Sequence, residues 1–293
     1  MKNGFLGKLA FWRSATRSGE LGVFIGTASL WVFQPATDTK AESFASFDVN
    51  SKNWSVVFET IKNHYGTAKL QIVLSTAYYQ LLQADKPTVD ENEISQALIW
   101  SVKDMVSEPI SNIHLDYFES PIGTNNKLNV VIAARDKLVA LAENCIQSGF
   151  EISGISIEEL ALSHLYSADN MAHMIVTHMP EQELLLTVVK SGDLLMQRRV
   201  RGFTQLDKAK KEDLSYGIAD NLSLEIQRSM DYFESQLRQA PVSAINLLVE
   251  GESQALAELV AVNFNQTVTA IEHQSVPAYL AKLAYSELPR GEA

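Results

Sequence analysis

The sequence has a single cysteine, Cys145, among its 293 residues. One thiol excludes an intramolecular disulfide and any metal site built from several cysteines, and it fits a reducing compartment. Cys145 lies within the apolar rhythm of residues 137–146, so we expect a thiol packed in the core rather than a reactive one.

Long hydrophobic runs are also lacking. The longest, residues 21–33, contains a glycine and is shorter than the about 20 residues that a membrane-spanning helix needs. The amino-terminal residues are too often interrupted by charge to match a secretory signal. We therefore expect no membrane span and a cytoplasmic protein.

Positive charge is scarce: 24 Lys and Arg residues stand against 35 Asp and Glu residues, which gives a net charge of −11 at pH 7. A protein with this negative net charge repels the phosphate backbone of nucleic acid, so we expect no nucleic-acid partner. The six histidines lack the spacing of metal ligands, and neither a Walker loop nor a Gly-x-Ser-x-Gly motif is present. The sequence therefore predicts no metal site and none of the common hydrolase or P-loop sites.

Residues 1–19 differ from the rest of the chain, because they contain four basic residues and no acidic one. Phe5, Leu9 and Trp12 recur there at helical spacing, among Lys2, Lys8, Arg13 and Arg17. Basic and apolar residues mixed in this way are typical of segments that rest on an anionic membrane surface. Gly4 and Gly7 weaken such a helix, and a disordered leader fits the segment equally well.

The order of predicted elements occurs twice along the chain. Alternating and apolar patterns predict three strands, a helix and a strand at 21–26, 29–34, 41–49, 55–64 and 69–75. The same order returns at 173–179, 183–189, 194–200, 218–237 and 245–250. Between the copies we expect a strand at 77–83 that forms a hairpin with 69–75, a helix near 90–105, strands at 110–118 and 127–134, a helix at 136–147, a strand at 151–157 and a helix at 157–166. A helix at 253–263, a strand at 266–271 and a helix at 276–286 end the chain.

This duplication points to an α/β protein with two related lobes. Two such units facing one another across a cleft form the actin-like fold, a duplicated ribonuclease H-like architecture, although element order alone leaves other α/β arrangements open. In the actin-like interpretation the chain divides into a leader (1–19), the first part of the first lobe (20–84), an inserted small subdomain (85–155), a return helix (156–170) and a second lobe (171–293).

Residues 223–237, SLEIQRSMDYFESQL, resemble the PilM family of actin-like proteins from type IV pilus machinery. The matching string contains Glu225, Arg228, Asp231, Tyr232 and Phe233. Residues 97–120 more narrowly resemble the MshI family, the PilM-like component of the mannose-sensitive haemagglutinin (MSHA) pilus. The resemblance extends over roughly residues 20–275 and implies the actin-like fold.

The resemblance also implies partners and a ligand. In PilM relatives a groove beside the inserted subdomain receives the short cytoplasmic tail of a PilN-type inner-membrane protein, and ATP lies between the lobes. The expected partners are therefore a PilN-type tail and other proteins of the pilus assembly platform, with self-association and contact with the membrane surface as further expectations. The implied location is the cytoplasm, at the periphery of the inner membrane.

Three loops that would hold ATP depart from the family pattern. In the first, Gly26, Thr27 and Ser29 match, but Phe24 replaces an aspartate and Trp31 a lysine. The second loop carries Thr177, His178 and Met179, where the family has an aspartate, an apolar residue and a glycine. The third, normally a glycine cluster, carries only Gly251 between Glu250 and Glu252.

The cleft lacks the aspartate that would position Mg²⁺ and the glycine that would let the backbone approach the phosphates. It is therefore expected to bind ATP weakly or not at all, with no hydrolysis and no required cofactor. The first hypothesis is thus an interaction protein, an actin-like scaffold of an MSHA-type pilus with a vestigial nucleotide site. The alternative is an active ATP-dependent switch or ATPase of the pilus machinery, and a divergent cell-division or shape protein is a third reading. Residues 198–201, rich in arginine, form either a solvated strand end or a contact for an acidic partner.

Overall fold

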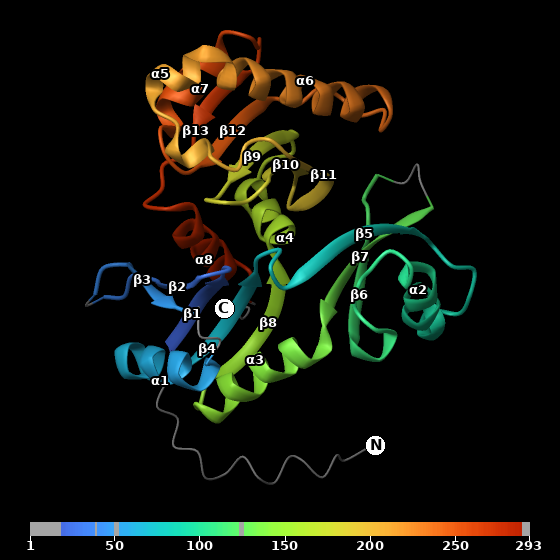
Figure 1. The fold of residues 1–293 in the computed structure, drawn as a ribbon, viewed down its shortest axis with the longest axis vertical. Coiled ribbons are helices and arrows are strands. Elements are labelled where there is room, and N and C mark those ends of the chain that lie inside the picture. The colour runs from blue at the N-terminus through green and yellow to red at the C-terminus, as the bar shows by residue number, and fades with distance from the viewer. Residues whose placement is uncertain (1–18, 39, 50–52, 123–125, 289–293) are drawn as a thin grey trace.

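The computed structural model describes residues 19–38, 40–49, 53–122 and 126–288 (Figure 1). It contains two five-stranded sheets with the same strand order, β3-β2-β1-β4-β8 and β11-β10-β9-β12-β13. The first is built from β1 (Gly19–Ile25), β2 (Ser29–Gln34), β3 (Ser43–Asp48), β4 (Ala68–Leu74) and β8 (Glu151–Ile157). The second is built from β9 (His173–His178), β10 (Leu184–Lys190), β11 (Asp193–Val200), β12 (Ala244–Val249) and β13 (Thr267–Ala270). The duplication predicted from the sequence is confirmed.

In each sheet the first three strands form an antiparallel meander, and the last two run parallel to the first strand. Strand β9 is buried along its whole length, and β1 is buried from Leu21 to Ile25. Continuous apolar strands of this kind occupy the middle of a sheet because helices cover both faces. The central strands therefore define the core of each lobe.

Helices cover the outer face of each sheet. In the first lobe these are α1 (Trp54–Tyr65) and α3 (Arg135–Gln147), whose Cys145 is fully buried, as expected, so that burial raises its pKa to about 12. In the second lobe they are α6 (Ala219–Ser235) and α7 (Ser253–Ala261), with short helical segments before them at Leu206–Lys208, Lys211–Asp213 and Leu214–Ile218. The Asn53 side chain accepts a hydrogen bond from the Val56 N–H at the start of α1, a typical amino-terminal cap.

Two helices cross between the lobes. Helix α4 (Glu158–Ser163) follows the last strand of the first sheet and packs on β10 and β11 of the second. Helix α8 (Val276–Ser286) follows the last strand of the second sheet and packs on β1, β2 and β4 of the first, where Figure 1 shows it in red beside the blue strands. A β-carbon on Gly22 would lie 2.0 Å from the Ala281 carbonyl oxygen, so the absence of a side chain there lets α8 lie directly on β1. Each lobe thus supplies the inner helix of the other.

The inserted subdomain is a three-stranded antiparallel sheet, β5-β7-β6, with one helix packed on it (Figure 1). Its elements are β5 (Tyr79–Asp85), α2 (Ile94–Val102), β6 (Ile113–Glu119) and β7 (Lys127–Ala134), with short 3₁₀ segments at Glu91–Glu93 and Ile110–Asn112. The sequence placed this insert at 85–155, whereas the structure has α3 and β8 in the first lobe.

The hairpin predicted between 69–75 and 77–83 is wrong. Strand β4 pairs with β1 and β8, and β5 pairs with β7 instead. The two strands are adjacent in sequence but belong to different sheets, because β5 opens the insert.

No helix among the described residues is long and apolar enough to cross a bilayer. The predicted membrane-contacting residues of the leader, Lys2, Phe5, Lys8, Leu9, Trp12, Arg13 and Arg17, lie outside the described residues.

Candidate functional site

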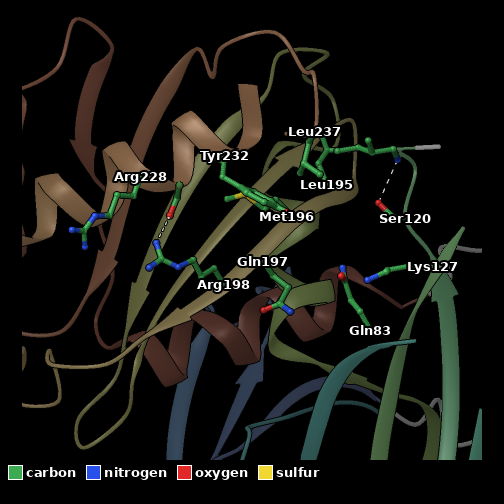
Figure 2. A pocket seen from close by; sticks show the side chains of 12 residues that line it. Gln83, Ser120, Lys127, Leu195, Met196, Gln197, Arg198, Arg228, Tyr232 and Leu237 are labelled. Carbon is green, nitrogen blue, oxygen red and sulfur yellow. Dashed lines mark hydrogen bonds between the residues drawn. The ribbon is translucent and has the colours of Figure 1, made fainter. Parts of the chain in front are cut away.

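A groove of about 550 Å³ lies between the insert and the second lobe (Figure 2). One wall comes from β11 and α6, and the other comes from β5, β7 and the segment around Ser120. Figure 2 shows Gln83 and Lys127 reaching from the insert toward the space in front of Gln197. The groove is therefore lined by parts of the chain that are far apart in sequence.

The polar lining of the groove is positively charged. Lys127 stands on the insert, and Arg198 and Arg228 stand on the second lobe. Both arginines bind the same carboxylate: Glu225 accepts from Arg198 Nη2 at 2.7 Å and from Arg228 Nη1 at 2.5 Å. One carboxylate neutralises one of these two cations, so the groove keeps a net positive charge in a protein that is negative overall.

The remaining lining of the groove is apolar. Met196 and Ile122 are nearly buried, and Ile122 packs into the core of the second lobe. Tyr232 is 49% exposed and, in Figure 2, extends from α6 over Met196. Leu195 and Leu237 complete this surface. Apolar surface beside a few charged groups is typical of a binding site.

The residues that resemble the PilM family have different structural roles. Phe233 is 1% exposed and belongs to the core of the second lobe. Asp231 accepts a hydrogen bond from Gln227 at 2.7 Å on the surface of α6. Arg228 and Tyr232 line the groove, and Glu225 holds Arg228 in place. One face of this helix therefore builds the core while another builds the groove.

A second, smaller hollow of about 200 Å³ lies on the other side of the insert, against the first lobe. It is lined by residues 76–80, 106–108, 132–134 and Lys137. The insert is thus flanked by a hollow on each side, and the larger one faces the second lobe.

The first of the three loops expected at the nucleotide cleft is a closed hairpin. The Gly26 N–H donates to the Ser29 carbonyl at 2.8 Å, so this backbone group is not free to bind a phosphate. The Ser29 hydroxyl accepts from the Trp31 indole N–H at 3.2 Å, while Thr27 is exposed. Phe24, which stands where the family has its acid, is fully buried in the apolar cluster between the lobes.

The second loop follows β9 and is acidic. Thr177 is buried at the end of the strand, and Met179 packs into the same interlobe cluster as Phe24. Burial lowers the pKa of His178, so its imidazole is neutral at pH 7 and supplies no charge for a phosphate. Beyond it the loop carries Glu181, which Lys208 binds at 2.6 Å.

The third loop lies beside the second, because β12 and β9 are parallel neighbours and the Glu250 N–H donates to the His178 carbonyl. Gly251 has a φ of 89°, and a β-carbon there would lie 2.7 Å from the Asp207 carbonyl oxygen. Its carboxylate neighbour, Glu250, accepts from the Val276 N–H at the start of α8. Gly251 therefore serves the packing of this loop, and the structure brings together Thr177 and Gly251 on the second lobe.

A buried ionic cluster joins the lobes near the insert. Arg199 Nη2, from β11, lies 2.9 Å from Glu158 Oε2 and 2.8 Å from Glu159 Oε1, both at the start of α4. The Tyr79 hydroxyl, from β5, donates to Glu159 at 2.5 Å. Burial, partly offset by Arg199, raises the pKa of Glu158 to about 7. Burial opposes the charge of Arg199, but the two carboxylates raise its pKa above the ordinary value.

Sequence reasoning missed most of this arrangement. It noted the arginines of 198–201 but gave no role to Lys127, Gln83 or Glu158. The alternation of β11 carries the available signal: Arg198 and Arg199 are neighbours on a strand, so they project to opposite faces, one toward α6 and one toward α4. Among the described residues no group of His, Cys, Asp and Glu is arranged to hold a metal ion.

No protein-family model matches the chain, and no curated protein matches it in sequence. Solved structures do match. A chain of a PilM-PilN type IV pilus biogenesis complex superposes with a TM-score of 0.63 and 15% identity, over 92% of this chain and 98% of that chain. The cytoplasmic domain of EpsL, an inner-membrane component of the type II secretion system of Vibrio cholerae, superposes with a TM-score of 0.56 and 15% identity, over 92% and 95%. The chain has the actin-like fold, with an inserted small subdomain in its first lobe.

Proposed function

We propose that this chain is an actin-like docking subunit in the assembly platform of a type IV pilus or a related secretion machine. It would bind the cytoplasmic tail of a PilN-type membrane protein from the cytoplasmic face of the inner membrane. The observation that carries the proposal is the match to the PilM-PilN complex over nearly the whole of both chains. The groove and the smaller hollow on the two sides of the insert support the proposal, because each offers a tail a mixed polar and apolar surface.

A finer assignment within this class is the MSHA pilus. It depends on the resemblance of residues 97–120 to the MshI family, a segment that forms parts of α2 and β6 of the insert. Other platform proteins, self-association and the membrane surface remain proposed partners. A net charge of −11 disfavours nucleic acid.

We further propose that docking needs neither bound nucleotide nor hydrolysis. Phe24 and Met179 come from the two loops that would face the phosphates, and both are packed in the apolar cluster that joins the lobes. Such residues give a Mg²⁺ ion no oxygen ligand. The carboxylates of Glu250 and Glu252 add negative charge to the third loop, which opposes a polyphosphate.

Binding of a tail peptide tests the docking function. Isothermal titration calorimetry of the full chain with the cytoplasmic tails of PilN-like proteins from the same gene cluster should show one tail binding at micromolar or tighter affinity. A scrambled peptide of the same composition is the control. Absence of binding by every such tail would refute the proposal.

A separate titration with ATP and Mg²⁺ distinguishes the scaffold from the ATP-dependent switch. The scaffold predicts no saturable heat at millimolar nucleotide and an unchanged affinity for the tail. Micromolar binding of ATP that changes tail affinity, and that is lost in Thr27→Ala or Ser29→Ala, would favour the switch.

A further inference from the structure

The groove between the insert and the second lobe is bordered by two sheet edges. Strand β11 is the edge of the second sheet and, among the described strands, pairs only with β10. Strand β5 is the edge of the insert sheet, where its one partner within the described residues is β7. Leu195, Gln197 and Gln83 on these strands line the groove. An edge strand has backbone N–H and C=O groups available for one more strand.

We infer that this groove binds an extended, acidic segment of a partner protein, which adds to β11 as a further strand. The inference deepens the proposed function and rests on it for the identity of the partner, because it states which chemistry the docked segment has and where it lies. Strand addition supplies main-chain hydrogen bonds, and side-chain pockets beside the edge supply specificity.

The charge of the lining selects an acidic occupant. Lys127 stands on one wall and Arg198 and Arg228 on the other, and no carboxylate is among the lining residues. Among the described residues Lys127 has no ion-pair partner, and the two arginines share Glu225. A segment with carboxylates at alternate positions would meet these cations from one of its faces.

The apolar lining fits the other face of such a segment. In Figure 2, Met196 and Tyr232 lie between the positive groups, and Ile122 also lines the groove. Side chains of an added strand alternate, so apolar residues at the positions between the carboxylates would contact this surface. The occupant is therefore expected to alternate acidic and apolar residues over about six to eight positions, a length typical of a strand.

A displayed library of random decapeptides, panned against the full chain, tests this chemistry. The selected peptides should alternate Asp or Glu with aliphatic or aromatic residues, and fluorescence anisotropy gives their dissociation constants. Lys127→Glu combined with Arg228→Glu should weaken binding about tenfold or more, because two charges reverse. Both side chains are exposed, so the fold should be retained, as circular dichroism can check. The matched control is Lys190→Glu, an exposed lysine at the end of β10, which should leave binding unchanged.

Main-chain pairing has its own readout. N-methylation of alternate amides of a selected peptide should abolish binding in one of the two registers, and amide hydrogen exchange should slow in residues 193–200 of the complex. Selection of neutral or basic peptides, binding that survives the double reversal, or protection confined to other elements would overturn the inference. So would self-association that is lost in the same double variant, because the occupant would then be a second copy of the chain.

The outcomes also separate this inference from the proposed function. A PilN-type tail that binds equally well to the double variant supports docking and refutes this groove as its place. Acidic peptides that bind in the groove while no PilN-type tail binds at all support the groove and refute the proposed partner.

Discussion

Replacing Arg199 by methionine should destabilise the protein strongly at neutral and alkaline pH. In the part of the chain that the structure describes, Arg199 is the only cation paired with Glu158 and Glu159, whose side chains are each 1% exposed. Removing one partner of a buried ion pair typically costs about 3–5 kcal/mol, because the remaining charge is buried without compensation. Here two carboxylates lose their cation, so we expect at least the upper half of that range at pH 8.

The loss should shrink as the pH falls. Burial already raises the pKa of Glu158 to about 7, and Arg199 acts in the opposite direction. Without Arg199 the pKa rises further, so the folded variant holds a proton that its unfolded chain releases above about pH 4.5. The folded variant then binds a proton at Glu158 that its unfolded chain releases, so its stability decreases by up to about 1.4 kcal/mol per pH unit, whereas the parent has this slope only up to the Glu158 pKa of about 7. The loss relative to the parent should therefore grow mainly between about pH 7 and pH 8 and be smaller at pH 5.5 and 6.5.

Urea denaturation followed by tryptophan fluorescence at pH 5.5, 6.5 and 8 measures these differences. The matched control is Arg201→Met: Arg201 pairs with Glu183 near the same end of β11, but its side chain is 92% exposed, so the change should be below about 0.5 kcal/mol. A decrease in the free energy of unfolding of less than about 1 kcal/mol at pH 8, or a decrease independent of pH, would refute the interpretation that Arg199 balances the charge of these buried carboxylates between the lobes.

Two further changes test the packing, and a third tests a buried carboxyl group. Gly22→Ala should lower the melting temperature, since its β-carbon would overlap the Ala281 carbonyl of α8 and overpacking costs about 1–3 kcal/mol or more; Gly19→Ala, with open space around it, is the control. Gly251→Ala should also destabilise in urea, because φ is 89° and the loop is tightly packed; a neutral result would contradict that account. Glu287→Gln should remove a pH dependence: burial raises its pKa to about 7, so the parent loses about 3 kcal/mol relative to the variant as the pH rises from 5 to 8, and parallel stability curves would disprove it.

The repeated elements could be predicted from the sequence because buried strands and amphipathic helices leave local patterns. The strands at 127–134 and 151–157 and the helix at 276–286 have the predicted bounds. The hydrophobic periodicity of an element depends on which of its faces are buried, so it can be recognised without knowing which element packs against it. Together with the duplicated order, these patterns indicated an α/β protein with two related lobes, and the resemblance of residues 223–237 to the PilM family selected the actin-like fold among such arrangements.

Which elements pair with which was harder to predict. Residues 79–85 have the composition of a strand next to another strand, and nothing local shows that β5 leaves the first sheet to start the insert. The helix near 90–105 ends at Val102 instead, because the chain turns there before the insert's second strand. The bounds of the insert depend on which strands pair over long distances in the sequence. The alternation of apolar and polar residues along a strand does not show with which strand it pairs.

The candidate site was hidden for a similar reason. Lys127 and Arg228 are a hundred residues apart, and each is an unremarkable surface cation in its own segment. Glu158 and Glu159 match the acidic first turn of many helices, so their burial on Arg199 has no signature in sequence. The resemblance located α6 as important, but only the structure separates Phe233, which builds the core, from Tyr232, which faces the groove.

The joint between the lobes, formed by the apolar cluster around Phe24 and the ion cluster around Arg199, affects the width of the groove. Its walls belong to the second lobe and to the insert of the first, so the width of the groove depends on how the two lobes are held. They are held by the apolar cluster that contains Phe24 and Met179, and by Arg199 on β11, the same strand that forms one wall. In an actin-like protein that closes on nucleotide, this joint would have to rearrange in each cycle. A joint made of close-packed apolar side chains and a buried ion cluster resists such movement, because each opening would expose apolar surface and unpaired charge. A groove of constant width is what an added strand requires, since main-chain hydrogen bonds tolerate little variation in distance.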